Sequence, residues 1–150
     1  MRALVRRVSN AEVKVSDQTS GSIQHGLVVF LGVDRDDHLS DADWILKKVL
    51  EMRIFEDETG KMNQSIRQDH GILLISQFTL FGNLQKGTRP SFNRASDPQK
   101  GNQLYSYVLQ ELMHSFAGVV QSGVFGADMK IRATDCGPVT IWLDSKNRKY

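Results

Sequence analysis

This chain of 150 residues has one cysteine, no long hydrophobic run and a small net charge. A single cysteine, Cys136, excludes an internal disulfide, and nothing else suggests secretion. The apolar stretch 27–33 is far shorter than the roughly 20 residues of a membrane span. The first residues lack the apolar core of a signal peptide. We therefore expect a cytoplasmic protein that folds as one domain over residues 1–150.

The formal net charge is only +2, which does not indicate a strongly basic nucleic-acid binder. The positive charges are nevertheless grouped at both ends of the chain and in its middle. The middle group contains Lys86, Arg89, Arg94 and Lys100. Such a group can bind phosphates without a high overall charge, or it can simply be solvated surface.

Side chains that bind metals or cofactors lack the spacing that such sites need. Four scattered histidines have no second ligand at helical spacing: His25, His38, His70 and His114. Residues 82–88 contain glycine and lysine but do not follow the P-loop pattern, and no dinucleotide fingerprint occurs. We therefore expect no metal and no cofactor.

The spacing of apolar residues predicts an α+β domain. Strands are expected over residues 3–8, 11–16, 27–33, 53–55, 72–80, 129–133 and 139–143. Helices are expected over 41–52, with Ser40 as N-cap, and from Asp97 to Gly118. Residues 17–21 are expected to form a turn. We predict mixed sheets, barrel-like or layered, with the two main helices outside.

The most informative stretch is residues 72–80. Its four aliphatic residues, 72–75, fit a strand that is buried on both faces. Polar residues follow, and in an extended chain Gln77 and Thr79 would share one face. Buried polar side chains need partners, so this run is either a functional site or a strand that reaches the surface. The residues alone leave both interpretations open.

No side chain can be named as a general base for this run. Ser76 would need a histidine, but His70 precedes the strand and would lie roughly 20 Å away at its other end. Cys136 is a second candidate nucleophile, yet its neighbour Asp135 would not lower the pKa of a thiol. A small residue in a turn is therefore favoured for Cys136 over the nucleophile of a thiol hydrolase.

Gly137-Pro138, at the entrance to the last predicted strand, is the second feature of interest. Proline at a strand start is often only an edge device. An X-Pro bond can also adopt the cis form, which turns two successive carbonyl groups to the same side. Such a pair could hold an ammonium group, and the sequence does not decide between the two roles.

Residues 76–80 (SQFTL) and 135–140 (DCGPVT) together resemble the SQxTL and NxGPxT motifs of the D-aminoacyl-tRNA deacylases. The resemblance runs nearly end to end and includes residues 5–8, 53–57 and 86–92. It implies a three-layer α/β/β fold and a homodimeric hydrolase without metal or cofactor. The implied reaction is hydrolysis of the ester between a D-amino acid and tRNA. It extends to glycine mischarged on tRNA(Ala).

The resemblance also implies roles for individual residues. Gly137 and Pro138, joined by a cis bond, would enter the active site of the partner subunit and leave no room for an L side chain. Arg7 would support this motif, and Met129 would line the pocket. Residues 76–79, which are Ser76, Gln77, Phe78 and Thr79, would orient the ester, while the tRNA 2′-hydroxyl assists the attack.

Asp135 and the basic residues Lys86 and Arg89 bear on how the chain would bind its substrate. Asp135 stands where the family has asparagine, and an ionised carboxylate accepts hydrogen bonds but cannot donate them. Lys86 and Arg89 are candidates for contact with tRNA. A non-catalytic RNA-binding module would use the same basic loop, and it remains the alternative function.

Overall fold

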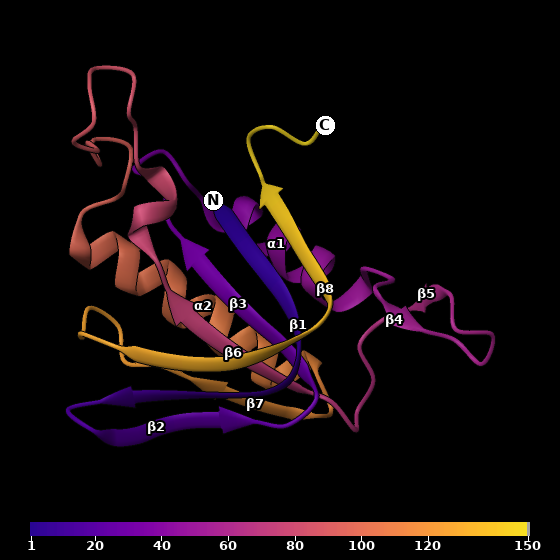
Figure 1. The fold of residues 1–150 in the computed structure, drawn as a ribbon. Helices are drawn as coiled ribbons and strands as arrows, with labels where there is room; N and C mark the ends of the chain where they lie inside the picture. Colours follow the sequence, from indigo (N-terminus) through magenta and orange to yellow (C-terminus); the bar gives the residue numbers. More distant parts are fainter. Residues whose placement is uncertain (150) are drawn as a thin grey trace.

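The computed structural model describes residues 1–149, and a mixed sheet of six strands is its main feature (Figure 1). The order is β2-β1-β3-β6-β7, and β8 also pairs with β1. β3, β6 and β7 run parallel, and the other pairs are antiparallel. The six strands are β1 (Arg2–Val15), β2 (Gln18–Ile23), β3 (Gly26–Gly32), β6 (Gly71–Ser76), β7 (Val119–Ser122) and β8 (Lys130–Asp144).

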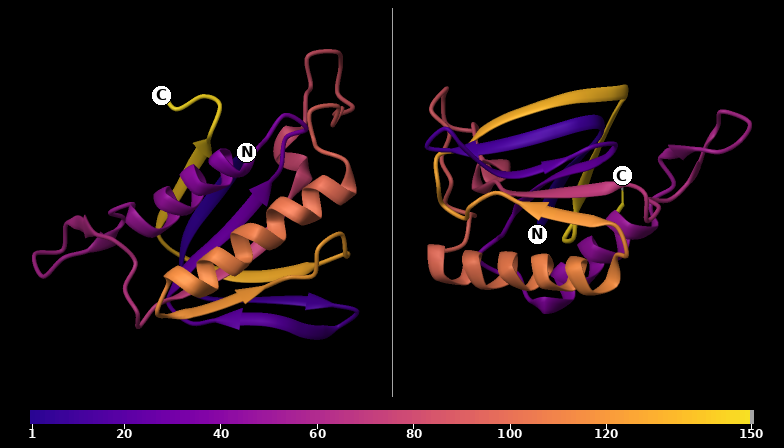
Figure 2. Two further views of the ribbon diagram at one scale, coloured as in Figure 1. Left: turned by 180° about the vertical axis from the view of Figure 1, so that it is seen from behind. Right: turned by 90° about the horizontal axis from the view of Figure 1, so that it is seen from below.

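The chain forms three layers, as expected. β1 is long and bent: its first half pairs with β3, its second half with β2, and β8 follows it along nearly its whole length. The helices α1 (Leu39–Glu51) and α2 (Pro98–Ser115) cover one face of the central strands. β2 and the adjoining halves of β1 and β8 cover the other face (Figure 2). A separate hairpin of β4 (Phe55–Glu56) and β5 (Met62–Gln64) projects from one side.

The aliphatic residues of β6 fill both cores. Ile72 and Leu74 belong to the core beneath the helices, whereas Leu73 and Ile75 belong to the core between the two strand layers. All four are fully buried. Burial of one such side chain stabilises the fold by about 2 kcal/mol. The prediction of a strand buried on both faces is confirmed for residues 72–75, which lie within β6.

Several predicted strand boundaries were wrong. Residues 3–8 and 11–15 belong to one strand, β1, because β8 stays paired with it through the irregularities around Val8, and Ser16 lies in the following turn. Residues 130–133 and 139–143 likewise belong to one strand, β8, with Gly137-Pro138 inside it. Residues 18–21, which were expected in a turn, belong to β2 (Gln18–Ile23), and β7 was not expected. The short strand expected at 53–55 lies at Phe55–Glu56.

The helices differ from expectation mainly at their ends. α1 begins at Leu39, and its N-cap is His38 rather than Ser40, because the Asp41 carboxylate accepts the His38 N–H at 3.0 Å. The Asp97 cap of α2 is confirmed, since its carboxylate accepts the N–H of Lys100 at 3.0 Å. α2 ends at Ser115, before Gly118. No helix within residues 1–149 is long and apolar enough to cross a membrane.

Candidate active site

Residues 76–79 lie where β6 leaves the sheet. The N–H of Gln77 donates the last bond to β3, to the carbonyl of Leu31 at 2.8 Å. A 3-10 turn, η1 (Phe78–Phe81), follows and is closed by the N–H of Gly82 on the carbonyl of Thr79 at 3.0 Å. The extended conformation predicted for residues 77–80 is therefore wrong. β3 ends at Gly32, so the chain has no further partner strand there.

The polar side chains of this turn contact each other. The Gln77 side-chain amide donates a hydrogen bond to the hydroxyl of Thr79. Ser76 and Gln77 are half-buried, whereas Thr79 is exposed. Within residues 1–149, neither the Ser76 nor the Thr79 hydroxyl contacts a histidine or a carboxylate. Neither hydroxyl is therefore paired, among these residues, with a side chain that could act as its general base.

A cavity of about 530 Å³ opens beside the turn, and residues 76–78 form part of its wall. Phe125, Met129 and Ile131 contribute apolar side chains, so Met129 lies where the resemblance implied a pocket residue. Tyr105 lines the opposite wall from α2, and its hydroxyl donates to the carbonyl of Leu74 at 3.0 Å. Burial raises the pKa of Tyr105 to about 12, so its phenol stays neutral.

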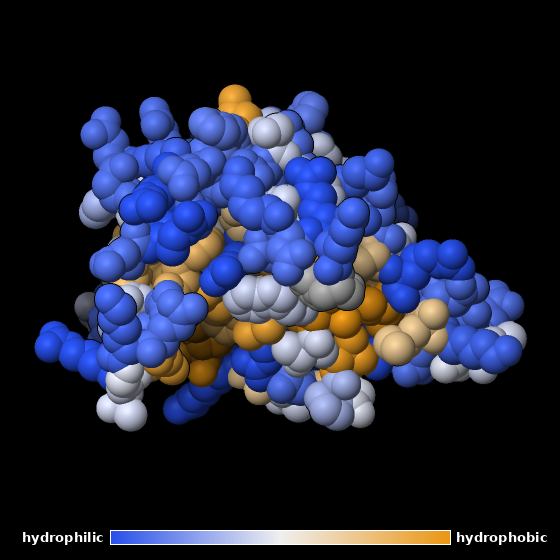
Figure 3. All heavy atoms as spheres, turned by 90° about the horizontal axis from the view of Figure 1, so that it is seen from above, coloured by the Kyte–Doolittle hydropathy of each residue, from blue (hydrophilic) through white to orange (hydrophobic). Residues whose placement is uncertain are grey.

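The sequence did not identify Tyr105 as a wall of the cavity. Its helical spacing with Leu104 and Val108 placed it only on the apolar face of α2, where all three are buried. The hydroxyl of Tyr105 on this apolar face could have marked it as unusual. It does not indicate which cavity the ring lines. Seen from above, the molecular surface shows hydrophobic residues, some of them recessed, between hydrophilic ones (Figure 3).

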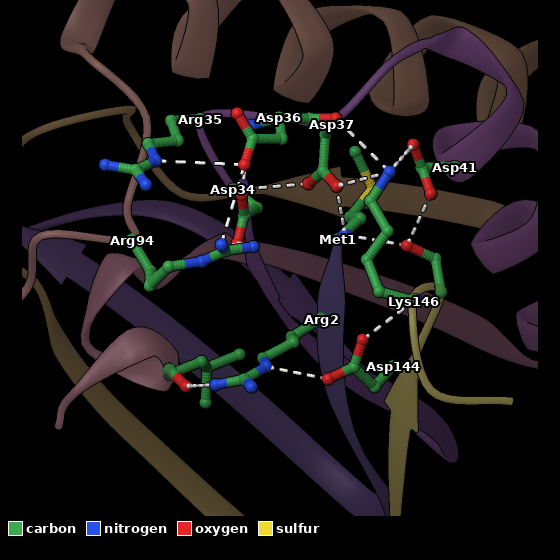
Figure 4. Close-up of polar contacts among 12 residues, drawn as sticks. Met1, Arg2, Asp34, Arg35, Asp36, Asp37, Asp41, Arg94, Asp144 and Lys146 are labelled. Carbon is green, nitrogen blue, oxygen red and sulfur yellow. Dashed lines mark hydrogen bonds and ion pairs between the residues drawn. The ribbon is translucent and has the colours of Figure 1, made fainter. Parts of the chain in front are cut away.

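The remaining wall of the cavity, residues 95–98, is attached to the loop after β3 by backbone and charged contacts (Figure 4). The N–H of Ser96 donates to the carbonyl of Val33 at 2.9 Å. Arg94 pairs with Asp34 at 2.8 Å. In the same loop, the buried carboxylate of Asp37 accepts a hydrogen bond from the N-terminal ammonium group of Met1 at 2.5 Å. The first two contacts attach the segment before α2 to the end of β3 and the loop that follows it.

Gly137-Pro138 forms an irregularity in β8 opposite Arg7, and its peptide bond is cis. Arg7 is buried beneath it and donates to the carbonyls of Cys136 at 3.3 Å and Ile54 at 2.6 Å. Gly137 has a φ of +114°, and a Cβ there would lie 3.1 Å from Arg7 Nη2. Glycine is therefore required at this position. Both Gly137 and Pro138 are exposed.

The two motifs do not meet within one chain. Arg7 pairs with Leu27 at the start of β3, whereas Leu31 pairs with Ser76. Four residues of β3 thus separate the motifs, which is about 13 Å along the strand. Neither Gly137 nor Pro138 lines the cavity. Figure 1 shows η1, after β6, and the bend of β8 toward different ends of the sheet.

The other residues singled out in the sequence have structural contacts of their own. His70 lies just before β6 and packs against the rings of His25 and Phe55, at centroid distances of 4.7 and 4.3 Å. Cys136 is half-buried. Within residues 1–149, no group of three His, Cys, Asp or Glu side chains is placed to hold a metal ion. Lys86 and Arg89 are exposed on the loop between η1 and α2.

A family model and the curated relatives of this chain point to the same protein family. The family model described as D-Tyr-tRNA(Tyr) deacylase matches residues 4–144. A D-aminoacyl-tRNA deacylase of Syntrophus aciditrophicus (strain SB) is 50% identical over 147 residues, 97% of this chain and 98% of the relative. One of Kosmotoga olearia is 48% identical over 149 residues, 99% of each. A solved structure named c-Myc DNA Unwinding Element Binding Protein has a TM-score of 0.90 and 34% identity, covering 96% of this chain and 98% of that one.

These matches span the whole fold, and they define an enzyme that hydrolyses the ester bond of an aminoacyl-tRNA. The chain belongs to the D-Tyr-tRNA(Tyr) deacylase family. The resemblance inferred from residues 76–80 and 135–140 is thereby confirmed.

Proposed function

We propose that this protein is a cytoplasmic homodimer that hydrolyses D-aminoacyl-tRNA, and also glycyl-tRNA mischarged on tRNA(Ala), to free amino acid and tRNA. One observation carries the dimeric part of the proposal. The exposed motif around Gly137 lies about 13 Å along β3 from the motif around Ser76. A second copy of the chain can supply the missing motif to each cavity.

In this proposal the cavity beside residues 76–79 receives the aminoacyl end of the tRNA. Backbone N–H groups and hydroxyls of the turn orient the ester and stabilise the oxyanion, at about 3 kcal/mol per donor. Water attacks the ester carbonyl with assistance from the 2′-hydroxyl of the terminal adenosine. The absence of a histidine or carboxylate on the hydroxyls of Ser76 and Thr79, within residues 1–149, supports this role for the substrate.

Selectivity in this proposal comes from exclusion. The carbonyl groups around Gly137 and Pro138 of one subunit meet the substrate's amino group in the other subunit and leave no room for an L side chain. Arg7 supports the motif through its bond to the carbonyl of Cys136. Glycine has only a hydrogen atom where the L side chain would be, so exclusion cannot reject it.

The experiment is hydrolysis of D-tyrosyl-tRNA and L-tyrosyl-tRNA by the purified protein. We expect rapid release of D-tyrosine, little release of L-tyrosine, and release of glycine from glycyl-tRNA(Ala). Equal rates for the two tyrosine esters would contradict the selectivity. Salt-sensitive tRNA binding without ester cleavage would instead indicate the non-catalytic RNA-binding module.

A further inference from the structure

The loop between η1 and α2, residues 82–94, carries an unusual charge pattern; we call it the basic loop. From His70 to Ser96 the sequence contains no aspartate or glutamate. The same segment contains the cations Lys86, Arg89 and Arg94. Because no acid adjacent in sequence neutralises them, any neutralisation has to come from elsewhere in the fold.

Within residues 1–149, only one of these three cations, Arg94, has a carboxylate partner. Arg94 reaches back to the loop after β3 and pairs with Asp34 at 2.8 Å and Asp36 at 3.5 Å. Lys86 and Arg89 are exposed and, within residues 1–149, pair with no carboxylate. Other arginines of the molecule, such as Arg2 and Arg6, do have carboxylate partners. Lys86 and Arg89 are therefore available to an anionic partner.

Lys86 and Arg89 share a small polar hollow of about 300 Å³. The other lining residues are amides and a hydroxyl, from Asn83, Gln85, Ser91 and Asn93. Backbone bonds between Asn83 and Ser91, of 2.8 and 2.9 Å, hold the two ends of the basic loop together. The hollow thus offers two cations and several hydrogen-bonding groups, which suits phosphates and polar ring edges rather than an apolar ligand.

The polar hollow adjoins the active-site cavity through a pair of aromatic rings. Phe78, which lines the cavity, packs edge-on against Phe92 with ring centroids 5.1 Å apart. Phe92 lies in sequence between Ser91 and Asn93, which line the hollow. Phe78 is 58% exposed, so part of its ring is free to contact a ligand. Exposed aromatic rings beside cations are the usual combination for binding single-stranded nucleic acid.

We propose that the basic loop binds the single-stranded nucleotides that precede the terminal adenosine of the tRNA. Lys86 and Arg89 contact their phosphates, and the exposed part of Phe78 stacks against a base. The inference rests on the proposed function, because the terminal adenosine must occupy the cavity for the preceding nucleotides to reach the hollow. It assigns the affinity for tRNA to a surface outside the cavity.

The double variant Lys86→Ala/Arg89→Ala tests this with two substrates. The first is D-tyrosyl-tRNA, and the second is D-tyrosyl-adenosine, the same ester without the preceding nucleotides. We expect kcat/KM for the tRNA ester to fall about tenfold, mainly through KM, as for lost phosphate contacts. We expect the rate for the adenosine ester to stay unchanged. The control Lys47→Ala/Lys61→Ala removes the same charge from exposed sites on α1 and the β4–β5 hairpin.

Each outcome decides the proposal. An equal loss for both substrates would mean that the basic loop shapes the cavity, and an unchanged rate for both would mean that it does not bind tRNA; either overturns the inference. If the wild-type protein cleaves neither ester, the proposed function fails. Binding of uncharged tRNA then tests the loop alone. The double variant should reduce the steepness of the plot of log binding constant against log salt concentration by about 1.4, because it loses two contacts to single-strand phosphates. An unchanged slope would overturn the inference.

Discussion

Arg6 on β1 and Asp135 on β8 form a two-bonded ion pair across adjacent strands. Arg6 Nε and Nη2 donate to the Asp135 carboxylate at 3.0 and 2.8 Å. Asp135 lies two residues before Gly137, at the position where the family resemblance has asparagine. The charge that distinguishes aspartate from asparagine is thus matched by a local arginine. The pair holds one side of the Gly137 motif, while Arg7 holds the other through the carbonyl of Cys136.

Replacing Asp135 tests whether this pair positions the motif. We expect Asp135→Ala to lower the free energy of unfolding by about 0.5–1 kcal/mol, because the pair is partly exposed. We also expect it to lower the ratio of D-ester to L-ester hydrolysis. Asp135→Asn keeps one hydrogen-bond acceptor, so its stability and its D/L ratio should lie between those of the wild-type protein and Asp135→Ala. Urea unfolding and both hydrolysis rates are measured; loss of stability with an unchanged D/L ratio would show that the pair serves the fold alone.

Gly137→Ala should damage the motif itself. The backbone of Gly137 has a φ of +114°, and a Cβ would lie 2.9 Å from Val139 Cγ2 and 3.1 Å from Arg7 Nη2. Backbone strain and crowding together cost on the order of 1–3 kcal/mol of stability. Hydrolysis of the D-ester should fall with it.

The matched control is Gly60→Ala. Gly60 also has a positive φ, +76°, but a Cβ there has no neighbour within 4 Å, and it lies in the turn between β4 and β5. Gly60→Ala should therefore show the strain without the crowding and leave the hydrolysis rate intact. Equal losses of activity in the two variants would contradict a specific role for Gly137.

Thr79→Ala distinguishes the contribution of the Thr79 hydroxyl to catalysis from that of the 2′-hydroxyl of the tRNA. The Thr79 hydroxyl accepts from the Gln77 amide, and within residues 1–149 it contacts no histidine or carboxylate. We expect single-turnover hydrolysis of D-tyrosyl-tRNA to fall no more than about tenfold, because backbone N–H donors of the turn remain. D-tyrosyl-tRNA that ends in 2′-deoxyadenosine should react far more slowly with the wild-type protein. The reverse pattern would make Thr79 the nucleophile.

Some of this fold could be predicted because the signals were local. Four consecutive aliphatic residues, 72–75, suit a strand covered on both faces, and Asp97-Pro98 places an N-cap and a proline where α2 begins. The turn after Ser76 could not be predicted in this way. Its conformation follows from the end of β3 at Gly32, more than forty residues earlier in the chain.

The candidate site was predictable only in part for a related reason. The motifs around Ser76 and Gly137 were recognised by resemblance, not by any chemistry that their residues show alone. The cavity wall around Ser96 depends on the pairing of Arg94 with Asp34, sixty positions apart. The separation of the two motifs follows from the register of β1, β3 and β6, which no single segment encodes.

His70 makes stability depend on pH. Burial, and next the charge of His25, lower the pKa of His70 below its usual 6.5. The folded state therefore prefers the neutral ring, whose Nδ1 accepts the N–H of Arg67 at 3.3 Å. Since the unfolded chain takes up the proton first, this contribution is complete above about pH 6.5 and is lost as the pH falls below it.

Urea unfolding at pH 7.5 and pH 5.5 measures this dependence. The wild-type protein should lose more stability between these two values than His70→Phe, which keeps an aromatic ring beside His25 and Phe55 but cannot take up a proton. His114→Phe is a control for the general effect of removing one histidine, since His114 is exposed in the last turn of α2. An equal pH dependence in the wild-type protein and His70→Phe would assign the acid sensitivity to other groups.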